Sequence, residues 1–74
     1  MAERTYQSGQ GGEIDMAAGH VFRWMIQGER TPEIYGWVEK DHEIVKGSGG
    51  WWRTDDPREA VTLASANLDI PLED

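Results

Sequence analysis

The sequence predicts an α+β fold in which an antiparallel meander of three or four β-strands carries one C-terminal α-helix packed on one face. Residues 20–27 and 33–40 each alternate large apolar residues with other side chains, which is the period of a β-strand. Residues 56–68 show the start signals and the apolar spacing of a helix. A chain of 74 residues is long enough for one small domain.

We expect residues 1–18 to form a flexible tail and residues 19–74 to form the folded domain. Residues 7–12, QSGQGG, are polar and rich in glycine, which makes ordering of the backbone costly in entropy. A single helical turn over residues 13–19, EIDMAAG, would be too short to be stable alone.

Alternation sorts the side chains of the two long strands onto opposite faces of the sheet. The sets are Phe22, Trp24 and Ile26 against Val21, Arg23 and Met25 in the first strand, and Tyr35 and Trp37 against Ile34, Gly36 and Val38 in the second. Residues 28–32, with a glycine and a proline at the two ends, predict the loop between them.

The segment after residue 40 is less regular. Asp41-His42 predicts a tight reversal, followed by a short third strand over residues 43–46; one longer bent strand over residues 33–46 is the alternative. Residues 47–50, GSGG, predict a turn, and residues 51–54, WWRT, a last short strand. Adjacent strand residues face opposite ways, so one of Trp51 and Trp52 should enter the core and the other should lie on the uncovered face.

The helix has the clearest signal in the chain. Asp56 is a favoured N-cap, Pro57 occupies the first helical position, and Glu59 completes the pattern of a capping box. The apolar positions Ala60, Val61, Ala64 and Leu68 form one stripe. We expect Asn67 to close the helix before Pro71, and the last residues to lie extended along the core edge.

Composition narrows the classes of function. The chain has 14 acidic and 7 basic residues, a net charge of −7, which disfavours binding to nucleic acid and to anionic membranes and favours a partner protein with a basic surface. There is no cysteine, so disulfides and thiolate metal sites are excluded. The N-terminal residues lack the pattern of a secretory signal, and we expect a cytoplasmic protein. A homodimer is another way for so small a chain to bury surface.

No motif commits the chain to a reaction. The glycine clusters GQGG and GSGG lack the context of phosphate-binding loops. His20 and His42 are not paired at metal-ligand spacing, and solvated roles for them are far more common than a site with Asp41 or Glu43. We therefore expect no enzyme activity, no cofactor and no metal.

The aromatic residues are the candidate site. One helix can cover only one face of the sheet, so several large side chains should remain on the other face. This face would then expose more apolar surface than a sheet face that only contacts water. Tryptophan, tyrosine and arginine dominate the energetics of protein interfaces. The predicted partner-binding residues are Arg23, Tyr35, Trp37, Trp51, Trp52 and Arg53.

From these residues the sequence predicts a small acidic, non-enzymatic protein-interaction module, with a regulator or inhibitor encoded by a phage or mobile element as one setting. The alternative is a binder of single-stranded nucleic acid that stacks bases on Trp and Arg side chains. A cage of aromatic rings for a cationic ligand is a further reading of the same residues.

The order of the elements, a three-stranded meander and then a helix that opens after Trp52-Arg53-Thr54, resembles the small arm-binding domains of phage integrases and AP2-type DNA-binding domains. That resemblance would imply DNA binding through a basic sheet. Here the corresponding sheet carries Glu33, Glu39, Asp41 and Glu43, and no family motif matches residue by residue. The departure weighs against DNA binding.

Overall fold

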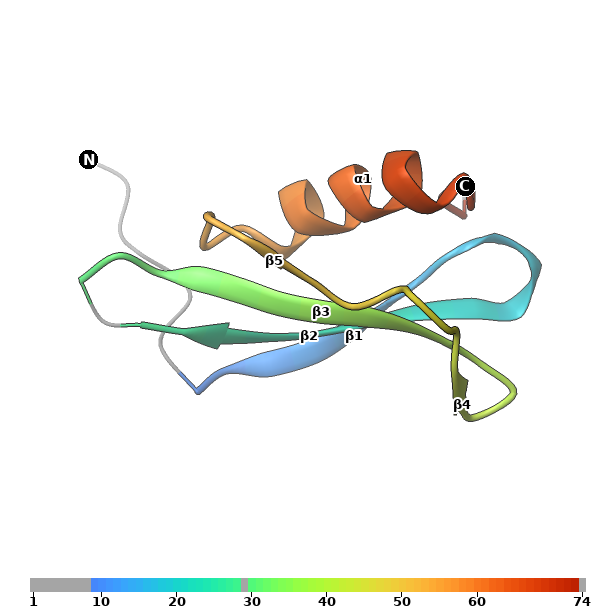
Figure 1. The fold of residues 1–74 in the computed structure, drawn as a ribbon, viewed down its shortest axis with the longest axis horizontal. Helices are drawn as coiled ribbons and strands as arrows, with labels where there is room; N and C mark the ends of the chain where they lie inside the picture. The colour runs from blue at the N-terminus through green and yellow to red at the C-terminus, as the bar shows by residue number, and fades with distance from the viewer. Residues whose placement is uncertain (1–8, 29, 74) are drawn as a thin grey trace.

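The computed structural model describes residues 9–28 and 30–73 and has an antiparallel sheet with one helix across one face (Figure 1). The predicted α+β fold with a C-terminal helix is confirmed. The elements are β1 (Gly11–Asp15), a 3-10 turn η1 (Ala17–Gly19), β2 (His20–Gln27), β3 (Glu33–Lys40), β4 (Glu43–Ile44), β5 (Gly50–Trp52) and α1 (Pro57–Leu68).

The N-terminal part of the fold corrects the expected boundary at residue 18. Gly11–Asp15 forms β1 and pairs with β2 over its whole length, and Met16 is buried in the core with 1 % exposure. The strand was missed because glycines carry no apolar alternation. Residues 1–8 lie outside the described residues. The helical turn that the sequence allowed over residues 13–19 is not formed: residues 13–15 belong to β1, and only Ala17–Gly19 makes a 3-10 turn, with Ala18 in a left-handed conformation.

The two faces of β2 and β3 are sorted as the alternation predicts. Strands β2 and β3 pair antiparallel along eight residues each. The face under α1 holds the core, whose buried members are Met16, Phe22, Trp24, Ile26, Ile34, Val38, Ala60, Val61 and Ala64. No element of the described chain covers the opposite face in Figure 1, and we call it the open face.

Strand glycines make room for aromatic rings on the core face. A Cβ atom at Gly12 would lie 2.9 Å from Cζ2 of Trp24, and a Cβ at Gly36 would lie 2.6 Å from Cε1 of Phe22. A Cβ at Gly50 would lie 2.9 Å from the ring of Trp52. Each of these rings therefore lies across the backbone of a glycine, which lets rings fill a thin core.

Strands β4 and β5 share one edge of β3, end to end. β4 pairs with residues 39 and 40 of β3, and β5 pairs with residues 34 to 36. Between them Ser48, 3 % exposed, replaces a strand partner: its hydroxyl accepts a hydrogen bond from Val38 N at 3.0 Å and donates to Val38 O at 3.2 Å. Residues 43–46 thus form a short separate strand and the start of a turn, which agrees with the prediction of a short third strand and not with one long bent strand over residues 33–46.

The start of α1 follows the prediction with one difference. The Asp56 carboxylate accepts a hydrogen bond from Arg58 N at 3.0 Å. The Glu59 carboxylate does not accept a hydrogen bond directly from Asp56 N, as it would in a simple capping box. Instead the Thr54 hydroxyl bridges the two groups, accepting from Asp56 N at 3.1 Å and donating to Glu59 Oε1 at 2.7 Å. The capping box is therefore completed through a third residue.

The end of α1 differs from the expected closure at Asn67. The helix ends at Leu68, and Asp69 is its left-handed cap with φ 59°. The residues after it run extended, as predicted: Leu72 bridges to Met16, and Ala17 N donates to Pro71 O at 2.9 Å. The C-terminal segment is thereby fastened to the turn after β1.

Candidate partner-binding face

The register of the sheet brings the predicted site residues into rows on the open face. Met25, Tyr35 and Trp51 lie in one row across β2, β3 and β5. Glu13, Arg23 and Trp37 lie in the next row across β1, β2 and β3. A third row runs across β1, β2, β3 and β4, and its members are Asp15, Val21, Glu39 and Ile44.

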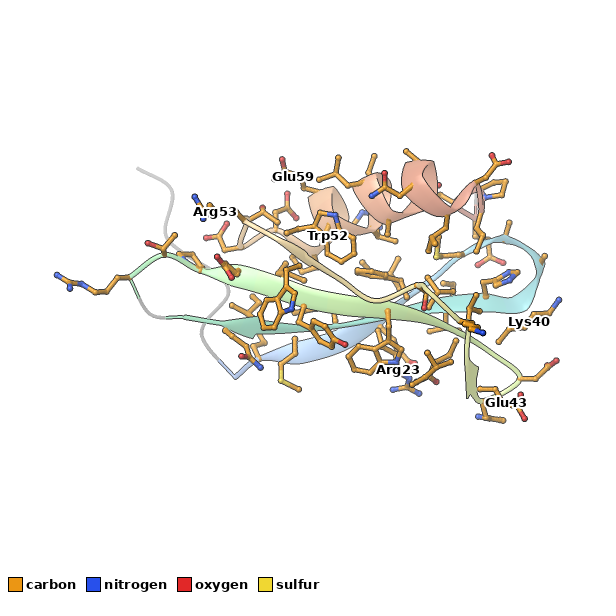
Figure 2. All side chains as sticks on the ribbon, viewed as in Figure 1. Arg23, Lys40, Glu43, Trp52, Arg53 and Glu59 are labelled. Carbon is orange, nitrogen blue, oxygen red and sulfur yellow. The ribbon has the colours of Figure 1, made fainter. Side chains whose placement is uncertain are left out.

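The two adjacent tryptophans have opposite surroundings. Trp51 is opposite Tyr35 on the open face and is 55 % exposed. Trp52 is opposite Ile34, and its ring meets Phe22 edge-on at 5.7 Å. Figure 2 shows Trp52 between β5 and α1. Of the predicted site residues, Trp52 therefore does not join the open face.

Three aromatic rings make a continuous stack on the open face. The Tyr35 ring centroid lies 4.9 Å from that of Trp51 and 5.5 Å from that of Trp37, both in tilted arrangements. Beside Tyr35 and Trp37 is a hollow of about 240 Å³, closed on its far side by Ile44, Val45 and the backbone of the 47–49 turn. We call it the aromatic hollow.

Both predicted arginines are matched with carboxylates. Arg23 bonds Glu39 Oε1 at 3.0 Å and lies 3.4 Å from Glu13 Oε1, and Figure 2 shows it on the side of the sheet away from α1. Arg53 lies 3.7 Å from Glu33 Oε2 and is 79 % exposed. The positive charge of Arg23 is therefore compensated by two neighbouring strands, whereas Arg53 makes one long, solvent-exposed contact that compensates little of its charge.

Glu39 is a site residue that the sequence reasoning missed. Its carboxylate accepts hydrogen bonds from Trp37 Nε1 at 2.8 Å and from Arg23 Nε at 3.0 Å. The bond from Trp37, followed by the bond and charge of Arg23, lowers the pKa of Glu39 below 4.5, against the opposing effect of desolvation. The spacing of two between Trp37 and Glu39 on a strand was the signal that could have found it.

The histidines do not form a metal site with their neighbours. His20 Nδ1 donates to Ala17 O at 2.9 Å, at the 3-10 turn, while His42 lies in the reversal after β3. Across residues 9–28 and 30–73, no three His, Cys, Asp or Glu side chains come together as metal ligands.

None of the helical segments within the described residues has the length and apolarity to cross a membrane. The cytoplasmic location expected from the sequence stays a prediction. No protein-family model, curated protein or solved structure matches the chain.

Proposed function

We propose that this protein is a non-enzymatic binding module whose open face docks a basic segment of a partner protein. The observation that carries the proposal is the aromatic stack of Trp51, Tyr35 and Trp37 on the face that α1 does not cover. Buried or half-buried aromatic side chains at the centre of a patch supply most of the binding energy in protein interfaces.

The apolar content of the open face supports docking over simple solvation. Trp51, a member of the aromatic stack, is 55 % exposed, and the flanking residues Met25 on β2 and Ile44 on β4 are 40 % and 66 % exposed. Contiguous exposed apolar surface of this kind marks interaction sites on small proteins. Its removal from water on docking is the driving force of the proposal.

The charges around the stack favour a basic partner. Carboxylates of Glu13, Glu39 and Asp41 line a second hollow of about 400 Å³ at the other end of the open face, together with Arg23 and His42. The chain carries a net charge of −7. Complementary charge accelerates association and selects among partners more than it adds affinity.

The same charges weigh against single-stranded nucleic acid. Stacking platforms for bases combine aromatic rings with uncompensated cations that follow the phosphates. Arg23 on the open face is paired with carboxylates of β1 and β3, and Arg53, just after β5, lies 3.7 Å from Glu33. A phosphate backbone would have to displace the carboxylates of Glu13 and Glu39 from Arg23.

The proposal is tested by affinity capture from lysate with the full chain and two variants as bait. A protein retained by the wild type and by Leu63→Ala, but lost by Trp51→Ala, is then purified and titrated into ¹⁵N-labelled chain. Leu63 is the matched control because it is an exposed apolar residue, 44 % exposed, on α1. Loss of Trp51 should weaken binding at least about 30-fold, the effect of removing an interface hot spot.

Two results would contradict the proposal. One is a partner whose binding perturbs amide signals of α1 and leaves the open face unchanged. The other is quenching of tryptophan fluorescence by single-stranded oligonucleotides, relieved steeply by salt, which would support nucleic-acid binding instead.

A further inference from the structure

We infer that the aromatic hollow is the anchor pocket for one alkylammonium group of the partner, a lysine side chain in its plain or methylated form. The inference rests on the proposed function and names the side chain that would occupy the face. Tyr35 and Trp37 supply ring surface, while Ile44 and Val45 supply an aliphatic wall. A lysine has the matching parts, an aliphatic stem and a compact cation at its tip.

The size of the aromatic hollow fits a single side chain. Its volume of about 240 Å³ is below the roughly 300–1,000 Å³ of pockets that hold small-molecule ligands. The turn that closes it contains Gly49, where a Cβ would lie 3.3 Å from the Tyr35 hydroxyl, so the glycine avoids a tight contact with the side chain that lines the hollow.

The lining of the aromatic hollow carries no formal charge of either sign, so its attraction for a cation comes from the faces of the two rings. Its lining has no Lys, Arg or His, so an anion would find no formal positive charge there. The hydroxyl of Ser48 is already engaged by the backbone of Val38, as donor and as acceptor. The lining therefore offers an anionic ligand no formal positive charge, and it distinguishes a cation from a neutral ligand through cation–π contact with the rings.

The hydrogen bond between Trp37 and Glu39 strengthens the attraction for a cation. Trp37 Nε1–H donates to Glu39 Oε2 at 2.8 Å, and a carboxylate on the indole N–H makes the face of the ring more negative. Glu39 Oε1 is bonded to Arg23 at 3.0 Å, so the ring face, and not the carboxylate, is the contact expected for the ammonium group. Trp37 is thus the central residue of the pocket.

The experiment follows the four indole N–H signals and the amides of ¹⁵N-labelled full chain during titration with small probes. The probes are n-butylammonium and n-butyltrimethylammonium chloride, with n-butanol as the neutral control, ethylguanidinium as the competing cation and sodium chloride at matched ionic strength. Saturable shifts are expected at the Trp37 indole and at the amides of Ile44, Val45 and Gly49. The ammonium probes should bind about 2- to 5-fold more tightly than butanol, the factor of one exposed cation–π contact.

Variants locate the binding. Trp37→Ala should abolish the shifts of Val45 and Gly49, Trp37→Phe should retain them with lower affinity, and Leu63→Ala should leave them unchanged. Whichever ammonium probe binds more tightly identifies plain or methylated lysine as the source. Equal affinity for butanol, tighter binding of ethylguanidinium, or shifts that survive Trp37→Ala would each overturn the inference. A partner that docks on the open face and depends on Trp51 would still support the proposed function in that case.

Discussion

The ring of Trp51 lies 4.9 Å from that of Tyr35, its register partner across β3 and β5, at an interplanar angle of 49°. The next residue, Trp52, has its side chain on the opposite face of the sheet, against the core. The pleat of a three-residue strand thus gives two consecutive tryptophans different roles: one extends the exposed stack, and the other fills space beneath α1.

We expect substitutions of the two tryptophans to separate binding from stability. Trp52→Ala removes a ring packed against the core and should lower the free energy of unfolding by about 3 kcal/mol. Trp51→Ala removes one exposed aromatic contact and should lower it by less than about 1.5 kcal/mol. Urea denaturation followed by circular dichroism measures both. Equal losses would contradict the assignment of the two rings to opposite faces.

We expect Gly36→Ala to destabilise the sheet. The new Cβ would lie 2.6 Å from Cε1 of Phe22 and 3.1 Å from Arg23 O, so the ring must move. Overpacking of this kind costs about 1–3 kcal/mol. Thermal denaturation of Gly36→Ala, Phe22→Leu and the double variant tests the cause. The loss in the double variant should be smaller than the sum of the single losses; strict additivity would show that ring and glycine are not coupled.

We expect Ser48→Ala to lower the free energy of unfolding by about 1–3 kcal/mol, because it leaves the buried Val38 N–H without its acceptor. Thr62→Ala is the control. Its hydroxyl also bonds a backbone carbonyl, that of Arg58 at 2.8 Å, but at an exposed helical position. Chemical denaturation should show little change in the control. Amide exchange at Val38 should accelerate in Ser48→Ala, and unchanged protection there would argue against the bridging role.

The lowered pKa of Glu39 predicts a contribution to pH dependence. Because the folded state holds this carboxylate ionised, its contribution to stability is complete above pH 4.5 and is lost as the pH falls through the lowered folded value. Glu39→Gln should therefore lose less stability than the wild type between about pH 6 and about pH 3. Trp37→Phe removes the hydrogen bond that lowers the pKa of Glu39 most, so the free energy of unfolding of this variant should also fall less than that of the wild type over this pH range. Parallel curves for all three proteins would contradict the assignment.

Local patterns were sufficient for the helix and for the two long strands. The signals at Asp56 and Pro57 and the alternation of residues 20–27 and 33–40 depend on neighbours in the sequence, and the structure confirms them. The end of the helix was harder, because a left-handed Asp69 can serve as a cap in place of Asn67. The bridging role of Thr54 depends on a bend that no pattern specifies.

The remaining features depend on register, which is a tertiary property. Gly11 and Gly12 show no strand pattern alone and become a strand opposite Met25 and Trp24. The pairing of Arg23 with Glu13 exists only once β1 is aligned with β2. For the same reason the sequence identified the aromatic members of the open face and missed the carboxylates between them.

The close packing of aromatic rings against strand glycines constrains how this sequence can change during evolution. At Gly12, Gly36 and Gly50 a small residue is required because a bulky one faces it, at Trp24, Phe22 and Trp52 respectively. Replacement of either partner during evolution should therefore drive compensating change in the other. Distant homologues of this chain should then keep three covarying pairs, each of one small and one large residue, even at low overall sequence identity. A search for these covarying pairs should detect more distant homologues than a search by sequence similarity.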